Sequence, residues 1–283
     1  MISKINQILS RTALIQAYFD RRRDFSFSFP RVISGIAKPP CTQIGPKHIN
    51  RIEESEDFLV VYIKSVEDPL YWPKALPLYD LYKVVTECFY EDDWHFYEVP
   101  ETTVTPGDTV IDCGAAEGIF SLRVLSRAGR IILFEPLPTF TPSLTKTFAN
   151  HPNVTIIAKA LGSTPGTASF SGTSLYGQIS DDGDMTIEVT TIDEWSRSEH
   201  AQVDFIKGDL ESFELEVLKG ARETILAYKP KIALTVYHPG NNWHQMVDLV
   251  HKVVPEYAYR VKGLSFNDRV ARPVMLHMWC QTR

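Results

Sequence analysis

Cysteine is scarce in this chain, and its spacing argues against two common uses of thiols. Four cysteines stand at positions 41, 88, 113 and 280, with no CxxC pair and no cluster of cysteine with histidine. A structural zinc site and a disulfide framework both need closer or more numerous cysteines. Reduced thiols in a cytoplasmic protein are therefore expected.

Long apolar runs and an excess of basic residues are also lacking. No segment approaches the roughly 18 consecutive apolar residues that a membrane span requires. Asn6, Gln7 and Ser10 interrupt the apolar stretch that a signal peptide would need. The net charge is −6, whereas binding to nucleic acid requires a basic surface. We expect neither a membrane span nor a nucleic-acid partner.

What the chain does contain is apolar material for a large core, because 44% of its 283 residues are hydrophobic. Its first twenty residues predict a helix with one apolar face, formed by Ile5, Ile8, Ile15 and Phe19. Arg21 to Arg23 follow. This helix is expected to dock on the core or on a second copy of the chain, with membrane-surface binding as the alternative. An irregular stretch through Pro39, Pro40 and Pro46 comes next.

A different pattern begins at Pro106, where short apolar segments alternate with amphipathic ones. Upstream of it, one strand is predicted at Phe58–Lys64. The predicted strands of the main sheet are Thr109–Cys113, Ile131–Glu135, Val154–Ala158, Val203–Lys207, Ile232–Tyr237, Tyr257–Val261 and Val274–Cys280. Helices are predicted at Ile119–Arg127, Thr141–Asn150, Leu215–Ala227 and Trp243–Val253, and an added hairpin at Thr167–Phe170 and Thr186–Thr190. This alternation indicates βαβ units and a mostly parallel sheet, whose ligands bind beyond the C-terminal strand ends.

The first of these strands ends in a loop with two glycines. The segment reads Asp112-Cys113-Gly114-Ala115-Ala116-Glu117-Gly118 and leads straight into a predicted helix. Gly114 allows a sharp turn close to a ligand, and Gly118 allows the helix to start near the strand. Alanine replaces the second glycine of GxGxxG, which disfavours a dinucleotide pyrophosphate. Asp112 and Glu117 suit a cofactor with a cationic amino group better. A plain tight turn is the alternative.

The second strand ends in Glu135-Pro136, at the distance from Gly114 where a carboxylate can accept both ribose hydroxyls of an adenosine-containing cofactor. A solvated charge at a strand end is the alternative for Glu135. Ala160 and Leu161, just beyond the third strand, are expected to lie near the adenine.

Two carboxylates, Asp209 and Glu211, follow the fourth strand. They are expected at the rim of the sheet where a substrate arrives, as cofactor contacts, as acceptor-positioning groups or as ligands of a divalent metal. Charge complementing a helix dipole is the alternative.

Tyr237 and His238 end the fifth strand at the same rim. Histidine is the natural general base there, because its ordinary pKa is close to neutrality. A histidine hydrogen-bonded into the loop before Pro239 is the alternative. The remaining histidines are expected to be surface or packing residues, with His95, inside an aromatic-rich stretch, as the exception.

Taken in order, these segments resemble the FkbM-type methyltransferases. The resemblance rests on the loop from Asp112 to Gly118, on Phe134-Glu135-Pro136, on Ala160-Leu161-Gly162 and on the block from Lys207 to Glu214. Pro230 to Ala233 and Tyr237-His238 complete it. One departure is Ser212, which stands where the acidic-x-Glu-Gly step has glycine.

The resemblance implies an α/β, class I, Rossmann-like fold with a seven-stranded, mostly parallel sheet and helices on both faces. Residues 101–283 would form the S-adenosylmethionine-binding methyltransferase domain, and residues 1–100 an accessory, substrate-capping segment. It further implies O-methylation of a sugar, glycan or natural-product hydroxyl. Cofactor contacts are expected at Asp112, Gly114, Ala115, Glu117, Gly118, Glu135, Pro136, Ala160 and Leu161. The catalytic pair is expected to be His238 and Asp209, with Glu211 and Tyr237 binding the acceptor. An NAD(P)-dependent oxidoreductase and a non-catalytic cofactor-binding scaffold are the alternatives.

Overall fold

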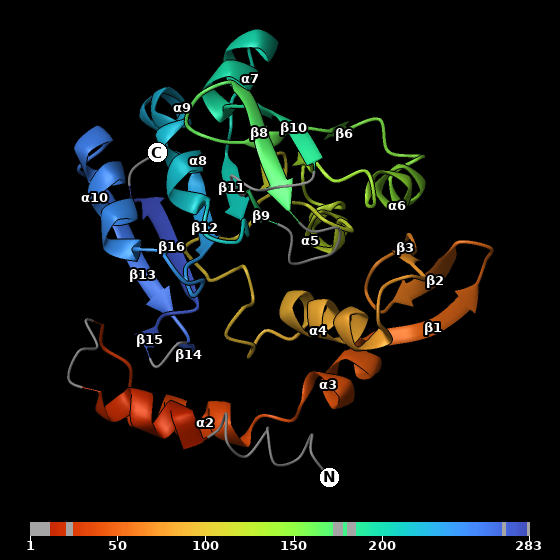
Figure 1. Ribbon diagram of the computed structural model, residues 1–283, viewed down its shortest axis with the longest axis horizontal. Coiled ribbons are helices and arrows are strands. Elements are labelled where there is room, and N and C mark those ends of the chain that lie inside the picture. The colour runs from red at the N-terminus through yellow and green to blue at the C-terminus, as the bar shows by residue number, and fades with distance from the viewer. Residues whose placement is uncertain (1–11, 21–24, 172–177, 180–184, 268–269, 282–283) are drawn as a thin grey trace.

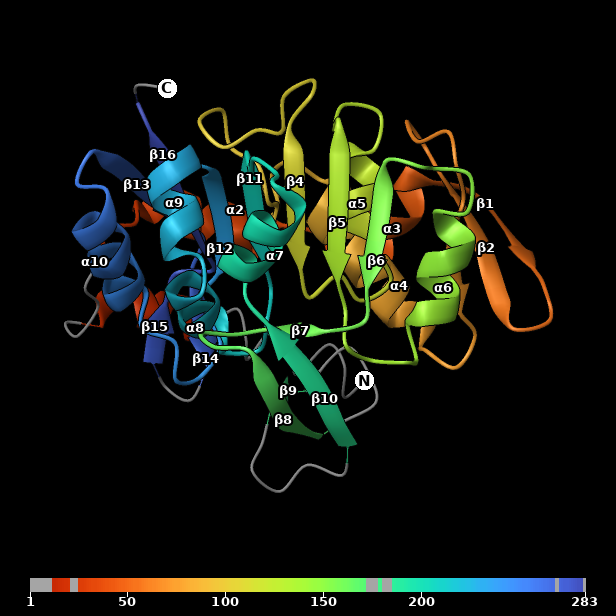
Figure 2. The ribbon, with the colours of Figure 1, turned by 90° about the horizontal axis from the view of Figure 1, so that it is seen from above.

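The computed structural model of the chain describes residues 12–20, 25–171, 178–179, 185–267 and 270–281. Its centre is a seven-stranded sheet in the order β13-β16-β12-β11-β4-β5-β6 (Figure 2). The strands are β4 (Thr109–Cys113), β5 (Arg130–Phe134), β6 (Val154–Ile157), β11 (Phe205–Gly208), β12 (Lys231–Thr235), β13 (Tyr257–Lys262) and β16 (Met275–Cys280). Neighbouring strands are parallel except where β16 pairs with β12 and β13. The predicted sheet is confirmed, and its strand order reverses between β4 and β11.

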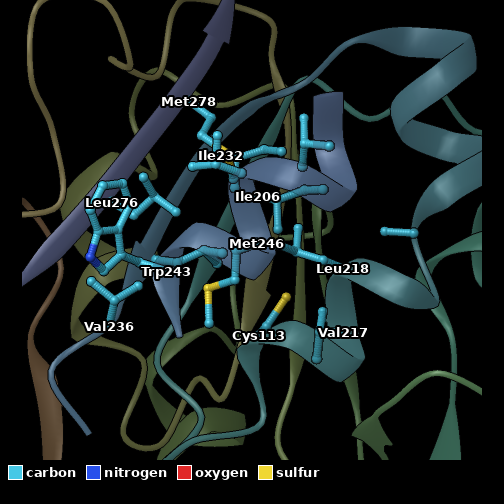
Figure 3. Packing of buried hydrophobic residues seen from close by; sticks show 14 of the residues in the cluster. Cys113, Ile206, Val217, Leu218, Ile232, Val236, Trp243, Met246, Leu276 and Met278 are labelled. Carbon is cyan, nitrogen blue, oxygen red and sulfur yellow. The ribbon is translucent and has the colours of Figure 1, made fainter. Parts of the chain in front are cut away.

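Helices cover both faces of this sheet because its strands alternate their apolar side chains between two cores. Ile111 and Ile232 belong to the core under α7 (Ile192–Glu199), α8 (Glu214–Lys219), α9 (Arg222–Tyr228) and α10 (Trp243–Val253). Figure 3 shows part of this core, in which Met246 and Trp243 of α10 pack onto Leu276 and Ile232. Val110 and Ala233 belong to the opposite core, which contains α4 (Leu78–Phe89), α5 (Ile119–Val124) and α6 (Thr141–Thr147).

The helix predicted over Leu215–Ala227 is two helices, and that prediction was wrong. α8 ends at Lys219 and α9 begins at Arg222. Gly220 between them packs against the chain near β7: a β-carbon on it would lie 2.0 Å from the carbonyl oxygen of Gly162. Gly220 is the C-cap of α8, and the chain turns there before α9 begins. α7 was not predicted at all.

A small four-stranded sheet projects beyond the carboxyl end of β6 (Figure 2). It contains β7 (Ala160–Leu161), β8 (Gly166–Ser171), β9 (Gln178–Ile179) and β10 (Met185–Thr190). β8 and β10 pair antiparallel, which confirms the predicted hairpin. A second short hairpin consists of β14 (Ser265–Asn267) and β15 (Val270–Arg272).

The N-terminal part packs along one side of the domain (Figure 1). It consists of a helix over 12–19, α2 (Phe29–Ala37), α3 (Cys41–His48), a sheet of β1 (Ile49–Glu54), β2 (Phe58–Ile63) and β3 (Leu70–Pro73), and then α4. The stretch expected to be irregular is therefore largely helical. Pro30 occupies the first turn of α2, where no amide hydrogen is needed, and Pro46 lies near the end of α3.

Pro40 is the N-cap of α3, and Pro46 lies inside that helix. Ile5, Ile8 and Arg21 to Arg23 lie outside the described residues. No helix in the described part of the chain is long and apolar enough to cross a membrane.

Candidate functional site

The turn after β4 is built around Gly114, at the point where the strand order reverses. Gly114 has a φ of 69°, and a β-carbon on it would lie 2.4 Å from the carbonyl oxygen of Asp209. Both the left-handed backbone and the close approach therefore require glycine. The amides of Gly114 and Ala115 donate to the carbonyl oxygen of Phe134, which ties the turn to the end of β5. Gly118 (φ 85°) precedes α5 and packs on Leu144 and Phe148.

Asp112 lies beneath this turn and does not line the cavity above it. Its carboxylate is fully buried, accepts a hydrogen bond of 2.7 Å from the Ser121 hydroxyl and pairs with the Lys207 ammonium at 2.9 Å. The ammonium also donates to the carbonyl oxygen of Gly114 at 2.8 Å. Burial alone would lower the pKa of Lys207, but the charges of Asp112 and Asp209 outweigh it and raise that pKa. Asp112 therefore acts on the turn through Lys207.

Glu135 follows β5 and faces the same turn. The amides of Ala116 and Leu137 donate to its two carboxylate oxygens at 2.8 and 2.9 Å. Burial raises the pKa of Glu135 to about 7, although these two hydrogen bonds oppose the rise. The carboxylate is thus fixed by backbone bonds, and its remaining lone pairs can accept hydroxyl groups from a ligand.

Glu117 is a second buried carboxyl group in the wall of the cavity. Its Oε2 atom has no hydrogen-bond partner among the described residues. Burial raises the pKa of Glu117 to about 8, against the opposing effect of its own backbone amide and of Lys207. A cationic ligand would supply the missing partner and favour the charged carboxylate.

These groups open on one cavity, which runs from the Gly114 turn to the ends of β11 and β12. Ten of the predicted site residues line it: Gly114, Ala115, Glu117, Glu135, Pro136, Ala160, Leu161, Asp209, Glu211 and Tyr237. The three predicted residues that lie behind the lining are Asp112, Gly118 and His238.

Asp209 stands at the end of the cavity opposite Glu135. The Tyr97 hydroxyl donates to its Oδ2 at 2.7 Å, and the Thr235 hydroxyl lies 3.0 Å from its Oδ1. His95 Nε2 is 3.6 Å from Oδ2. Burial would raise the pKa of Asp209, but His95, His238 and Lys207 outweigh burial and hold it well below its usual range. Asp209 is therefore a fixed negative charge.

His238 is enclosed by three carboxylates. Its Nδ1 lies 3.4 Å from Glu214 Oε1, and its Nε2 lies 3.4 Å from Glu211 Oε2 and 3.8 Å from Asp209 Oδ1. Burial alone would lower the pKa of His238, but Glu214, Asp209 and Glu211 raise it to about 9. The ring is consequently an imidazolium at neutral pH and neutralises part of the acidic cluster.

The same cluster offers donor atoms for a metal. Atoms of Asp209, Glu214 and His238 lie within 4.8 Å of one another. However, Glu214 Oε1 already faces the Leu210 amide and the Thr235 hydroxyl, each at 3.0 Å, and its Oε2 accepts from Asn241 at 2.8 Å. A divalent ion would also have to displace the His238 proton. The donor set fits a protonated imidazole better than it fits a metal.

Ser212 keeps the backbone conformation that the family's glycine would adopt. Its φ is 85°, and Glu211 before it has a φ of 48°. The Ser212 hydroxyl donates to the carbonyl oxygen of Pro239 at 2.6 Å. The departure from the acidic-x-Glu-Gly step therefore leaves the turn in place.

The N-terminal part contributes a wall of the cavity, and of its residues sequence reasoning singled out only His95. Its members are Lys83, Val84, Glu87 and Cys88 of α4, together with His95 and Tyr97. Lys207 was noted only as part of a motif. Its place within β11, a strand of four buried residues, could have indicated a structural role, because a buried lysine needs a buried partner of opposite charge.

The strand order, the glycine turn after β4 and the carboxylate after β5 together define a class I methyltransferase fold. Residues 112–261, more than half of the chain, match the Methyltransferase FkbM domain. The chain belongs to this family. No match was found among curated proteins.

Solved structures with a similar fold include three methyltransferases. The FkbM methyltransferase from Methylobacillus flagellatus is 20% identical, with 88% of this chain and 62% of that chain covered and a TM-score of 0.47. A precorrin-6y C5,15-methyltransferase from Geobacter metallireducens is 13% identical, with 64% and 83% covered and a TM-score of 0.40. An rRNA methylase from Streptococcus thermophilus is 10% identical, with 62% and 89% covered and a TM-score of 0.39. The present chain thus spans less than two thirds of the FkbM structure.

Proposed function

We propose that the chain transfers a methyl group from S-adenosylmethionine to a hydroxyl of a sugar, glycan or glycosylated natural product. The observation that carries the proposal is the shared cavity of Glu135 and Asp209, which end strands on either side of the switch point. In such sheets the cofactor and its reaction partner meet there.

The residues present fit S-adenosylmethionine. Glu135 would accept the ribose hydroxyls, and Ala160 and Leu161 would pack near the adenine. The orphaned Oε2 of Glu117 would accept the cationic amino group. Gly114 lets the turn approach the Asp209 carbonyl oxygen, where a β-carbon would not fit, and so holds the turn beside the cavity. When bound, the cofactor supplies an activated methyl group on a sulfonium.

The acceptor would enter between α4 and the end of β12. Tyr97 and Tyr237 line the cavity there, and Glu211 and Glu87 offer carboxylates. Aromatic side chains beside hydrogen-bond acceptors suit a sugar ring with its hydroxyl groups. Holding the hydroxyl oxygen in line with the methyl carbon would supply much of the rate.

The assignment of the general base to His238 stays a prediction. The raised pKa of about 9 is a physical argument against it, because only about one ring in a hundred would be neutral at pH 7. Asp209 is proposed to position the acceptor or the sulfonium with its fixed charge.

Two further properties are proposed for the whole protein. All four cysteines are free thiols, which supports a cytoplasmic location.

The N-terminal helix is proposed to dock on the core or on a second protomer. Deleting residues 1–23 should then lower the melting temperature or change the mass in solution while cofactor binding persists; an unchanged mass and melting temperature would contradict the proposal.

Cofactor binding is tested by calorimetry with S-adenosylhomocysteine, with NADH as the competing ligand class. Glu135→Gln should weaken S-adenosylhomocysteine binding by roughly 10- to 100-fold, because a charged acceptor is lost. Glu188→Gln, on an exposed side chain of β10 that lies outside the cavity, is the matched control. Binding of NADH in place of S-adenosylhomocysteine would contradict the proposal.

Methyl transfer is tested with labelled S-adenosylmethionine and a panel of p-nitrophenyl glycosides and free oligosaccharides. Label in a sugar hydroxyl supports the proposed acceptor class. If the cofactor binds but label appears only in acceptors of another class, the proposed sugar acceptor is wrong and only methyl transfer remains.

A further inference from the structure

His95 is the histidine that faces the cavity. Its side chain is 7% exposed, it lines the cavity, and its Nε2 lies 3.6 Å from Asp209 Oδ2. The ring is held edge-on between Tyr97 and Tyr237, at centroid distances of 5.1 and 5.7 Å. A hydrogen bond of 2.8 Å from its own amide to Asp93 fixes the backbone. The imidazole is therefore packed between the two tyrosines with its Nε2 toward Asp209.

His95 and His238 differ in their position: His95 lines the cavity, whereas His238 lies behind it among carboxylates. Both nitrogens of His238 face carboxylates, three in all. The ring of His95 has Asp209 at its Nε2 and interacts with the buried Glu87, while its Nδ1 is buried without a hydrogen-bond partner among the described residues, as are both nitrogens of His238.

We infer that His95, rather than His238, takes the proton from the acceptor hydroxyl, and that Asp209 stabilises the imidazolium that forms. This inference rests on the proposed methyl transfer to a hydroxyl. The acceptor oxygen bonds to the methyl carbon, and the electrons of the breaking carbon–sulfur bond go to sulfur. The hydroxyl proton goes to the His95 ring, which later releases it to water.

The acidic cluster then has a role in this arrangement. His238 holds Asp209 from the side away from the cavity, and the Tyr97 hydroxyl holds its other oxygen. Asp209 is thereby kept charged and in place beside His95 Nε2. A carboxylate at that position favours an imidazolium that appears during the reaction. His238 is on this view a positioning residue.

The first experiment needs no acceptor. Ring nitrogen chemical shifts of the histidines are measured by long-range ¹H–¹⁵N NMR at pH 7.5, with S-adenosylhomocysteine bound to the full chain. A neutral ring at His95 beside a charged ring at His238 supports the inference. A charged ring at His95 would overturn it, whatever the acceptor proves to be.

The second experiment compares His95→Gln, His238→Gln and the control His244→Gln on any p-nitrophenyl glycoside that takes up label. His95→Gln should lose on the order of 100-fold or more in kcat, with S-adenosylhomocysteine affinity within about threefold of the parent because His95 is not assigned to cofactor binding. A fourth variant, His95→Ala, leaves space where the ring was, and added imidazole should restore part of its activity. His244 lies in the first turn of α10, outside the cavity, so its variant should match the parent.

Retention of more than about a tenth of kcat by His95→Gln would assign the base elsewhere. If the parent labels no glycoside at all, the proposed sugar acceptor fails. The NMR result still decides whether His95 is available as a base.

Discussion

The Lys207 ammonium lies 2.9 Å from Asp112 Oδ1 and 2.8 Å from the carbonyl oxygen of Gly114. Lys207 and Asp112 are paired across the neighbouring strands β11 and β4. One buried cation therefore joins the two strands at the switch point and fixes the turn that faces the cofactor cavity.

Lys207→Met should destabilise the chain strongly, because it leaves the fully buried Asp112 without a counter-charge. Loss of one partner from a buried pair costs about 3–5 kcal/mol. Urea unfolding measures the change. The double variant Lys207→Met with Asp112→Asn should recover a large part of the loss, since the uncompensated charge is gone. Equal stability of the single and double variants would show that the ion pair is not the cause.

Gly114→Ala should weaken both folding and cofactor binding. The left-handed backbone alone costs an L-residue roughly 1–2 kcal/mol, and the new β-carbon would overlap the carbonyl oxygen of Asp209. Gly107→Ala is the matched control, because Gly107 has a φ of 91° with open space around it. It should show the backbone cost without loss of S-adenosylhomocysteine affinity. Similar losses in the two variants would remove the close approach from the explanation.

Local pattern was enough to predict the elements whose ends are fixed by local signals. β4 and α10 have the predicted bounds. β4 is a short apolar run that ends at a glycine turn, and the Asn242 side chain caps α10 by accepting from the amides of His244 and Gln245. α4 was missed although its apolar residues have a helical spacing, because the aromatic residues around it hid that spacing.

The sequence predicts the site residues that stand at strand ends, but not the side-chain contacts between distant segments. Parallel strands bring Glu135 and Asp209 to one edge, so their shared cavity follows from the order of the strands. The bond from Tyr97 to Asp209 spans 112 residues, and no local pattern reports it. Whether His238 points into the cavity or into a cluster of carboxylates depends on packing that sequence spacing does not encode.

Glu117 should make stability depend on pH in a specific direction. Its pKa is raised from an ordinary value near 4.5 to about 8 in the folded chain. The folded state therefore binds the proton more tightly, so this contribution to stability is complete below pH 4.5 and is lost as pH rises through 8. Glu117→Gln should melt at nearly the parent temperature near pH 4.5 and above it at pH 9.

The same carboxyl group should make cofactor binding favourable at higher pH, because a cationic amino group prefers an ionised Glu117. S-adenosylhomocysteine affinity should rise between pH 6.5 and 8.5 in the parent and rise less in Glu117→Gln, as measured by calorimetry. A parent and variant with the same pH profile would mean that Glu117 does not contact the bound cofactor.

The cluster of Asp209, Glu214 and His238 should work without a divalent metal. The raised pKa of His238, about 9, favours a protonated ring among these carboxylates, and amide and hydroxyl donors already use the oxygens of Glu214. EDTA should therefore leave the melting temperature and S-adenosylhomocysteine affinity unchanged at pH 7.5, and added Mg²⁺ or Mn²⁺ should not raise the melting temperature. A saturable stabilisation by Mn²⁺ that His238→Gln abolishes would contradict this. Such a result would assign a metal to the cluster, since a ligand that binds the folded state alone must raise its melting temperature.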